Sequence, residues 1–120
     1  MNTPPVDFTF VYELSENDTR YIYEVLSLFL TTVPEKLTEL EKLVPKEENY
    51  EKIAEIAHFL KSSSSVINVR DMYANLAQIE ALARSKTGLK EIQERFAQVV
   101  SNFSEAVPLI IAEKQKNKTS

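Results

Sequence analysis

Apolar residues recur along this chain at alternating steps of three and four residues, which is the spacing of one buried stripe on an α-helix. Capping side chains, charged connectors and prolines interrupt the stripes. The pattern therefore predicts four long helices, over about 18–44, 49–67, 70–85 and 89–112. The apolar residues between Phe8 and Leu14 predict one or two helical turns before them. We expect Pro34 to kink or break the first long helix, and Pro108 to bend the last.

The composition favours helices throughout. Of 120 residues, 43% are hydrophobic and only Gly88 is glycine, whereas sheets and hairpins need turn glycines and alternating β-branched residues. Gly88 stands where a tight turn between two helices would use it. Four amphipathic helices with short connections predict an all-α fold, an antiparallel up-down four-helix bundle with a short N-terminal helical segment. Residues 1–17 are then a flexible lead-in and short helical cap, 18–112 the bundle, and 113–120 a flexible tail.

The helix predicted over 49–67 carries the only histidine of the chain, His58. At about 100° per residue its large apolar side chains gather on one face, which is predicted to be core. These side chains are Ile53, Ile56, Leu60 and Ile67. The opposite face is predicted to point to water, and besides His58 it holds Glu51, Ala54, Glu55, Lys61, Ser62 and Ser65. An exposed imidazole is mostly neutral at pH 7, which leaves a ring nitrogen free to act as a nucleophile.

The surroundings of His58 suit an anionic group. The ammonium of Lys61 follows one turn later, within reach of the oxygens of a phosphoryl group on the ring. The run of four serines, 62–65, has two interpretations. Ser63 and Ser64 flank the buried side, where small residues let a neighbouring helix approach closely and a hydroxyl can bond to a carbonyl one turn earlier. A flexible linker is the alternative, although apolar residues keep helical register on both sides of the run.

The sequence around this histidine resembles the H-x-L-K-G-S-S…G-A…L…E signature of histidine-containing phosphotransfer (HPt) domains. The matching residues are the run His58 to Ser64, then Asn68-Val69, Leu76 and Glu80. The resemblance extends over about 18–110. It implies a four-helix bundle whose exposed histidine accepts a phosphoryl group from the aspartyl phosphate of one receiver domain and passes it to the aspartate of another.

Two residues depart from the signature, because this chain has Ser62 and Asn68 where the family usually has glycine. Ser62 is the smallest replacement that keeps a side chain, but one turn from His58 it could crowd an approaching receiver. Asn68 is expected to end the helix in the left-handed conformation, which asparagine tolerates better than most residues.

The resemblance implies a phosphocarrier and not an enzyme. The chain lacks a glycine-rich phosphate loop and a kinase signature, so we expect it neither to bind ATP nor to phosphorylate itself. The expected partners are response-regulator receiver domains and a hybrid histidine kinase. No cofactor is expected on this chain, and Mg²⁺ is expected on the receiver. Docking is expected over the central helix, where Ala54 and Ser62 keep the surface low, Ser65 flanks His58, and Glu55 and Lys61 orient the partner, with Gln78 of the third helix contributing.

Charge and composition exclude several other classes. A net charge of −4 and a pI near 5.1 speak against a nucleic-acid binder, which needs a basic face. Without cysteine and with one histidine, the chain has neither a disulfide framework nor an imidazole or thiolate zinc site. It shows no membrane span and no signal peptide, so we expect a cytoplasmic, monomeric and, from Met1 and the basic tail, free-standing protein.

Two other functions remain open at the level of sequence. The chain could keep the HPt shape and dock receivers or kinases without phosphotransfer, an interpretation that Ser62 supports. It could also be a hydrolase that uses His58 with carboxylates, but Glu51 and Glu55 lie on the same exposed helix and no second base is positioned as a partner.

Overall fold

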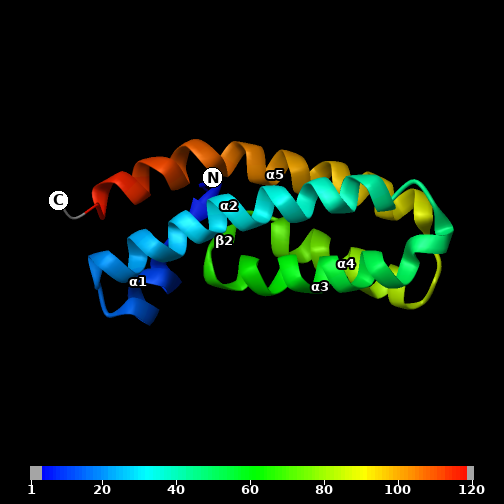
Figure 1. Cartoon of the computed structure of the whole chain (residues 1–120), viewed down its shortest axis with the longest axis horizontal. Coiled ribbons are helices and arrows are strands. Elements are labelled where there is room, and N and C mark those ends of the chain that lie inside the picture. The colour runs from blue at the N-terminus through cyan, green and yellow to red at the C-terminus, as the bar shows by residue number, and fades with distance from the viewer. Residues whose placement is uncertain (1–3, 119–120) are drawn as a thin grey trace.

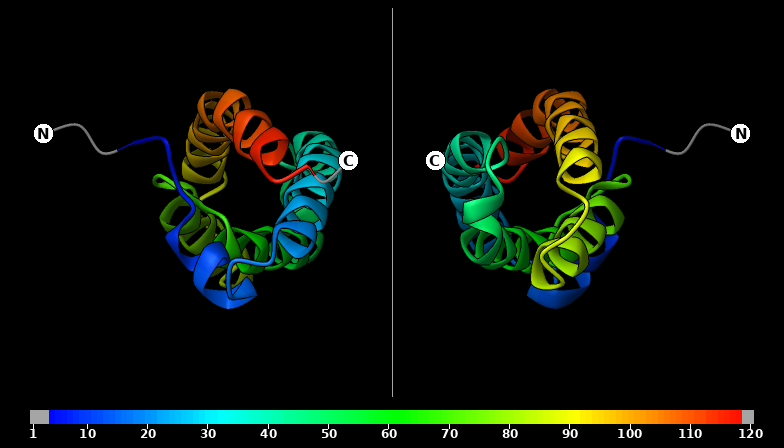
Figure 2. Two further views of the ribbon diagram at one scale, coloured as in Figure 1. Left: turned by 90° about the vertical axis from the view of Figure 1, so that its left-hand side faces the viewer. Right: turned by 90° about the vertical axis from the view of Figure 1, so that its right-hand side faces the viewer.

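The computed structural model of the chain describes residues 4–118. Its four long helices are α2 (Thr19–Leu43), α3 (Tyr50–Val66), α4 (Met72–Arg84) and α5 (Leu89–Lys116). The shorter elements are β1 (Val6–Asp7), α1 (Thr9–Ser15), the 3-10 helix η1 (Glu47–Asn49) and β2 (Asn68–Val69). Successive long helices run in opposite directions, and end-on they form a ring of four (Figures 1 and 2). The predicted all-α, up-down four-helix bundle is confirmed, and α1 is the predicted short N-terminal helix.

The predicted apolar stripes meet along the axis of the bundle. The four residues that marked the inner face of α3 are all buried, and Ile53, Leu60 and Ile67 are fully so. The other long helices contribute matching stripes. Their fully buried members include Ile22, Leu26 and Leu40 of α2, Met72, Leu76 and Ile79 of α4, and Ile92 and Ile110 of α5. This one-sided burial fixes the rotation of α3, and it therefore fixes which of its side chains face outward.

The first long helix runs through Pro34 without interruption, so the expected break is absent. Asp18 caps its start, since its carboxylate accepts hydrogen bonds from the backbone N–H groups of Arg20 and Tyr21 at 3.0 and 3.2 Å. Pro34 is exposed, while Val33 and Leu37 beside it are buried. Proline removes one backbone donor, but the apolar face packs on both sides of it and holds the helix together.

The N-terminal segment is more ordered than the predicted flexible lead-in. Val6 pairs with Val69 and Asp7 with Asn68 in an antiparallel two-residue ladder, and Val6 is buried. Asn68 is therefore part of a strand, and the expectation that it is left-handed is wrong. Asp71 adopts that conformation instead, with φ 64°. The ladder explains the difference, because it draws the residues after α3 into an extended conformation. Residues 1–3 of the predicted lead-in lie outside the described residues.

The C-terminal helix is longer than predicted. It continues through Pro108 to Lys116, so the flexible tail predicted over 113–120 is wrong for its described part. Contacts with the N-terminal half of the chain account for this. Asn117 is buried and bonded to Tyr12, and the ammonium of Lys114 lies 5.2 Å from the centre of the Tyr23 ring. Residues 119 and 120 lie outside the described residues.

The turn between α4 and α5 contains Gly88, as predicted. Gly88 has φ 72°, in the left-handed region, and is the residue immediately before α5. A Cβ at this position would lie 3.0 Å from Cδ2 of Leu82. Glycine is therefore favoured here, because a side chain would be strained at this φ and would press on Leu82. Within residues 4–118, none of these helices combines the length and the apolar character needed to cross a membrane.

Candidate functional site

His58 lies on the outer surface of α3, as its position on the helix predicted. The side chain of His58 is 57% exposed, whereas Ala57, the residue before it, and Leu60, two residues after it, are completely buried. The exposure follows from the amphipathic pattern of α3, because the helix turns its apolar face to the core and leaves this position outside. A ring so exposed is accessible to a second protein.

One edge of the imidazole is fixed by a carboxylate from the neighbouring helix. Nδ1 of His58 lies 3.0 Å from Oε2 of Glu80, which projects from α4 and whose side chain is only 9% exposed. An ionised carboxylate can only accept hydrogen bonds, so Nδ1 carries the hydrogen and donates it to Glu80. In the neutral ring, Nε2 then keeps its lone pair. The contact therefore selects the tautomer in which the nitrogen away from Glu80 is the nucleophile.

Two cations keep Glu80 ionised. Nζ of Lys61 lies 2.9 Å from Oε1, while Arg84 approaches Oε2 with Nε at 2.8 Å and a terminal nitrogen at 2.6 Å. Burial acts to raise the pKa of Glu80, but the hydrogen bonds from Lys61 and Arg84 and the charges of Lys61 and His58 outweigh it and lower the pKa to about 2. Glu80 is thus an anion at every physiological pH and a permanent acceptor for His58.

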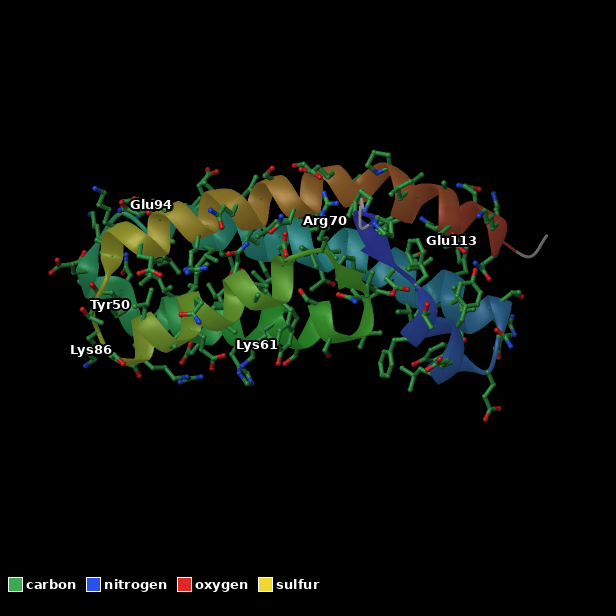
Figure 3. All side chains as sticks on the ribbon, turned by 180° about the vertical axis from the view of Figure 1, so that it is seen from behind. Tyr50, Lys61, Arg70, Lys86, Glu94 and Glu113 are labelled. Carbon is green, nitrogen blue, oxygen red and sulfur yellow. The ribbon has the colours of Figure 1, made fainter. Side chains whose placement is uncertain are left out.

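Lys61 is less free than the sequence suggested. Its side chain is 24% exposed and its ammonium is held by Glu80, and that hydrogen bond raises the pKa of Lys61. The ammonium also lies 6.0 Å from the centre of the Tyr73 ring on α4. Figure 3 shows Lys61 on the outer side of the α3 and α4 pair. Lys61, Arg84 and His58 therefore share one carboxylate, so a positive charge stands close to any group bound to the ring.

The four serines lie within α3, which excludes the linker interpretation. Ser64 is buried and donates to the carbonyl of Leu60 at 2.9 Å, as its position on the wheel predicted. Ser62 and Ser65 are exposed beside the histidine. The hydroxyl of Ser65 donates to the carbonyl of Ser62 at 2.6 Å, so it is turned back onto the helix. Ser62, one turn after His58, is exposed and has a small side chain, so it adds little bulk beside the imidazole.

Three other predicted site residues fall in different environments. Ala54 is 2% exposed, so the prediction that it lies on the water-facing stripe is wrong. It sits where α3 meets α4, and such a contact covers more of a helix than the apolar stripe alone indicates. Glu55 is exposed on α3, as expected. Gln78 is exposed on α4, but two residues along a helix correspond to a rotation of about 200°. Gln78 therefore points away from the side of α4 on which Glu80 meets His58.

The roles of Glu80 and Arg84 were missed at the level of sequence. In the sequence, Glu80 was identified only as the residue that matches the last position of the HPt signature. A signal was nevertheless present, because Glu80 follows Leu76 by one turn and is flanked by Ile79 and Ala83 on the buried stripe of its helix. A carboxylate on a buried stripe needs charged partners, and Arg84 follows it by four residues.

The comparisons with known proteins place this site within a family. The model of a family described as Hpt domain matches residues 24–112, which include His58, Lys61, Glu80 and Arg84. Neither the search of curated proteins nor the search of solved structures found a match.

Proposed function

The chain belongs to the Hpt domain family, and from this premise we propose that it is a histidine phosphotransfer protein of a multistep two-component phosphorelay. In this proposal His58 accepts a phosphoryl group from the aspartyl phosphate of one receiver domain and passes it to the aspartate of another. The observation that supports it best is the contact between Nδ1 of His58 and Glu80, at 3.0 Å on a ring whose side chain is 57% exposed. That contact leaves Nε2 as an accessible nucleophile.

The transfer needs no proton from either protein. The lone pair of Nε2 attacks phosphorus, the bond between phosphorus and the aspartyl oxygen breaks, and the receiver aspartate leaves as a carboxylate. The ring keeps its hydrogen on Nδ1 and gains a positive charge, which the adjacent carboxylate of Glu80 offsets. In the second transfer a carboxylate oxygen of the next receiver attacks phosphorus, and the electron pair of the N–P bond returns to Nε2. The imidazole is then neutral again.

Lys61 and Arg84 supply positive charge on this chain. Both are held against Glu80, so they lie beside the ring before the phosphoryl group arrives. A phosphoryl group adds close to two negative charges, and either cation could turn towards its oxygens while the other keeps Glu80 paired. We expect Mg²⁺ and the acidic residues that bind it to belong to the receiver, and the donor to be a hybrid histidine kinase. In this proposal the chain is a cytoplasmic phosphocarrier without kinase activity.

The alternative is a domain that docks receivers or kinases without accepting phosphate. Its support in the sequence was Ser62 in place of glycine. In the fold Ser62 stands beside a ring that remains more than half exposed, so this serine does not roof the imidazole. The transfer hypothesis therefore has the stronger support.

The decisive experiment is phosphotransfer from purified receiver domains. Receivers from the same genome would be phosphorylated with acetyl phosphate and Mg²⁺, freed of the small donor, and incubated with this protein. We expect an acid-labile, base-stable label on the protein and its loss on addition of a second receiver. His58→Gln should fold normally and take up no label. Label on that variant would place the acceptor elsewhere, and no label on the wild type from any receiver would favour the docking domain.

A further inference from the structure

A second polar cluster lies on the flank of α4 that faces away from His58. Within residues 4–118 four polar side chains are buried, and α4 contributes two of them, Glu80 and Asn75. Glu80 meets α3 at His58, whereas Asn75 contacts α5, because five residues along a helix correspond to a rotation of about 140°. In the ring of four helices α4 lies between α3 and α5 (Figure 2). The helix that orients His58 is therefore held by polar contacts on both flanks.

Asn75 is hydrogen-bonded to two residues of α5. Its Oδ1 accepts from a terminal nitrogen of Arg95 at 3.1 Å, and its Nδ2 donates to Oδ1 of Asn102 at 3.1 Å. Arginine can only donate, so the amide of Asn75 satisfies both partners in one orientation alone. Arg95 is itself fixed, since its Nε donates to Glu91 at 2.8 Å. The amide of Asn75 is thus held at both of its polar atoms.

The two partners bracket Asn75 along the axis of α5. Arg95 and Asn102 are seven residues apart, so they share one face of the helix and lie about 10.5 Å apart along it. Sliding α4 towards either end of α5, or turning it about its own axis, lengthens at least one of the two hydrogen bonds. These bonds therefore define both the rotation and the axial position of α4 on α5.

Apolar packing between α4 and α5 is incomplete in the same place. A hollow of about 400 Å³ lies there, and the side chains around it are polar or small. They belong to Asp71, Ala74, Asn75, Gln98, Ser101 and Asn102. The register of two packed helices is usually fixed by large side chains that interlock, and none lines this hollow. The hydrogen bonds of Asn75 therefore carry more of the register than they would in a fully packed interface.

Small movements of α4 would separate Glu80 from His58. The outer end of a helical side chain lies about 5–6 Å from the helix axis, so turning α4 by about 15° moves the Glu80 carboxylate by about 1.5 Å. Sliding α4 by the rise of one residue moves it by about 1.5 Å as well. The contact between Nδ1 and Oε2 is 3.0 Å, and a hydrogen bond is lost beyond about 3.5 Å. Either movement away from α3 releases the imidazole.

We propose that Asn75 is a positioning residue for His58, because its bonds to α5 hold α4 in the arrangement that puts Glu80 against Nδ1. Asn75 acts through Glu80 and has its own contacts on the α5 side. A buried polar contact of this kind adds little to stability, since an apolar side chain of similar size often replaces it at no cost. It instead selects one arrangement of the helices. The consequence for phosphotransfer rests on the proposed function, whereas the consequence for the ring does not.

The test reads the position of the ring hydrogen directly. His58 is the only histidine of the chain, so ¹⁵N NMR of labelled protein gives its two tautomers without overlap. At about pH 8.5, where an imidazole is neutral, we expect more than about 90% of the hydrogen on Nδ1 in the wild type. In Asn75→Leu, which has a similar volume but forms neither bond, at least about a third should move to Nε2. The urea concentration at half-unfolding should stay the same or rise in this variant.

Two further variants separate positioning from folding. Asn75→Asp is the conservative change, because its carboxylate accepts from Arg95 and, once the amide of Asn102 turns over, from Asn102 as well. Asn117→Leu is the matched control, since Asn117 is also a buried asparagine but is bonded to Tyr12 and not to α4. Both should keep the wild-type tautomer. Transfer from a receiver that labels the wild type should be about fivefold slower in Asn75→Leu and unchanged in Asn75→Asp.

The outcomes separate this proposal from the proposed function. If no receiver labels the wild type, the proposed function fails, and the tautomers still decide the role of Asn75. If Asn75→Leu keeps its hydrogen on Nδ1, or if Asn117→Leu loses it equally, the positioning proposal is overturned. If Asn75→Leu does not fold, Asn102→Ala takes its place, because Asn102 is only half-buried and its loss removes one of the two bonds. An unchanged tautomer in Asn102→Ala would then overturn the proposal.

Discussion

The carboxylate of Glu80 is the side chain that converts a surface histidine into an oriented nucleophile. It accepts from Nδ1 of His58 with one oxygen and holds Lys61 with the other, while Arg84 binds it from its own helix. A surface imidazole without such a contact rotates freely and exchanges its hydrogen between two nitrogens. The contact with Glu80 restricts both the rotation of the ring and the exchange of its hydrogen, so the imidazole loses less orientational freedom when a receiver binds.

Replacing Glu80 by glutamine tests this role. The side-chain oxygen of Glu80→Gln can still accept from Nδ1, but a neutral amide does not offset the positive charge that the ring gains on phosphorylation. We expect transfer to His58 to slow about tenfold, equivalent to about 1.4 kcal/mol in the barrier. The rate would be measured with one phosphorylated receiver at saturating concentration. Glu94→Gln, an exposed carboxylate on α5, is the control. An unchanged rate in Glu80→Gln would show that the carboxylate charge is not used.

Ser62 tests how closely the partner passes over α3. Ser62→Gly should transfer as fast as the wild type or faster, although glycine inside a helix lowers the free energy of unfolding by about 0.5–1 kcal/mol. Ser62→Leu should transfer more slowly, by about tenfold, because a bulky side chain one turn from His58 obstructs the approach of a receiver to the imidazole. Ser104→Leu on α5 controls for a new exposed leucine. If transfer is insensitive to size at position 62, the receiver approaches from the α4 side.

At the residue scale, the sequence predicted which side chains are exposed better than it predicted which side chains contact each other. Periodicity alone placed His58 outside and Leu60 inside, because both facts depend only on the rotation of one helix. The contact of His58 with Glu80 depends on how α4 is rotated and how far it slides along α3, and no single-helix pattern carries that information. Ala54 was misplaced for the same reason, since the width of the contact with α4 decides its burial.

At the scale of elements, the four long helices and the short helix α1 were predictable from the sequence, and the two short strands were not. The apolar stripes of the long helices repeat over many turns, whereas the ladder of Val6 and Asp7 with Asn68 and Val69 involves two residues on each side and has no period to detect. The last turn of α5 was missed because its stability comes from the Tyr12 and Asn117 contact, which joins residues more than a hundred positions apart. The expected break at Pro34 is absent, because the packing of apolar side chains on both sides of it outweighs the loss of one backbone hydrogen bond.

The turn between α4 and α5 allows a paired test of backbone conformation. Gly88→Ala places a side chain at φ 72° and 3.0 Å from Leu82, so we expect the free energy of unfolding to fall by about 1–2 kcal/mol. Lys86 has φ 54° and already bears that conformational cost. Lys86→Gly should therefore leave the stability unchanged or raise it by up to about 1 kcal/mol. Urea denaturation measures the change in the free energy of unfolding for each variant. If both variants changed it by the same amount and in the same direction, the turn would relax around either residue.

At the scale of the whole molecule, the site residues also join the bundle together. Glu80 receives His58 and Lys61 from α3, so the cluster that orients the nucleophile is also a polar contact between two helices of the core. The Tyr12 contacts do the same for the two ends of the chain. The fold thus joins α3 to α4 through the ion pairs of the site, and it joins the two ends of the chain through the hydrogen bonds of Tyr12.

The pH dependence of folding should report the Glu80 cluster. In the folded protein burial opposes the charge of Glu80, but Lys61 and Arg84 prevail and the pKa falls from 4.5 to about 2. A carboxyl whose folded pKa is depressed stabilises the fold fully above its unfolded pKa, and that contribution is lost as the pH falls from about 4.5 towards 2. Glu80→Gln cannot titrate, so it lacks this contribution at any pH. The wild type should therefore exceed the variant in free energy of unfolding at pH 7, by about 1–2 kcal/mol.

The informative quantity is the difference in the free energy of unfolding between the wild type and Glu80→Gln. The other carboxyl groups titrate in both proteins, so their contributions cancel in this difference. Urea denaturation at steps from pH 7 to pH 2 should show a constant difference down to about pH 5 and a steady decline below it. His58→Gln provides a second comparison, since it keeps Lys61 and Arg84 on Glu80 and should preserve most of the decline. A difference that stays constant to pH 2 would mean that Glu80 titrates alike in the folded and unfolded chain, and the ion pairs that orient His58 would then be too weak to hold the ring.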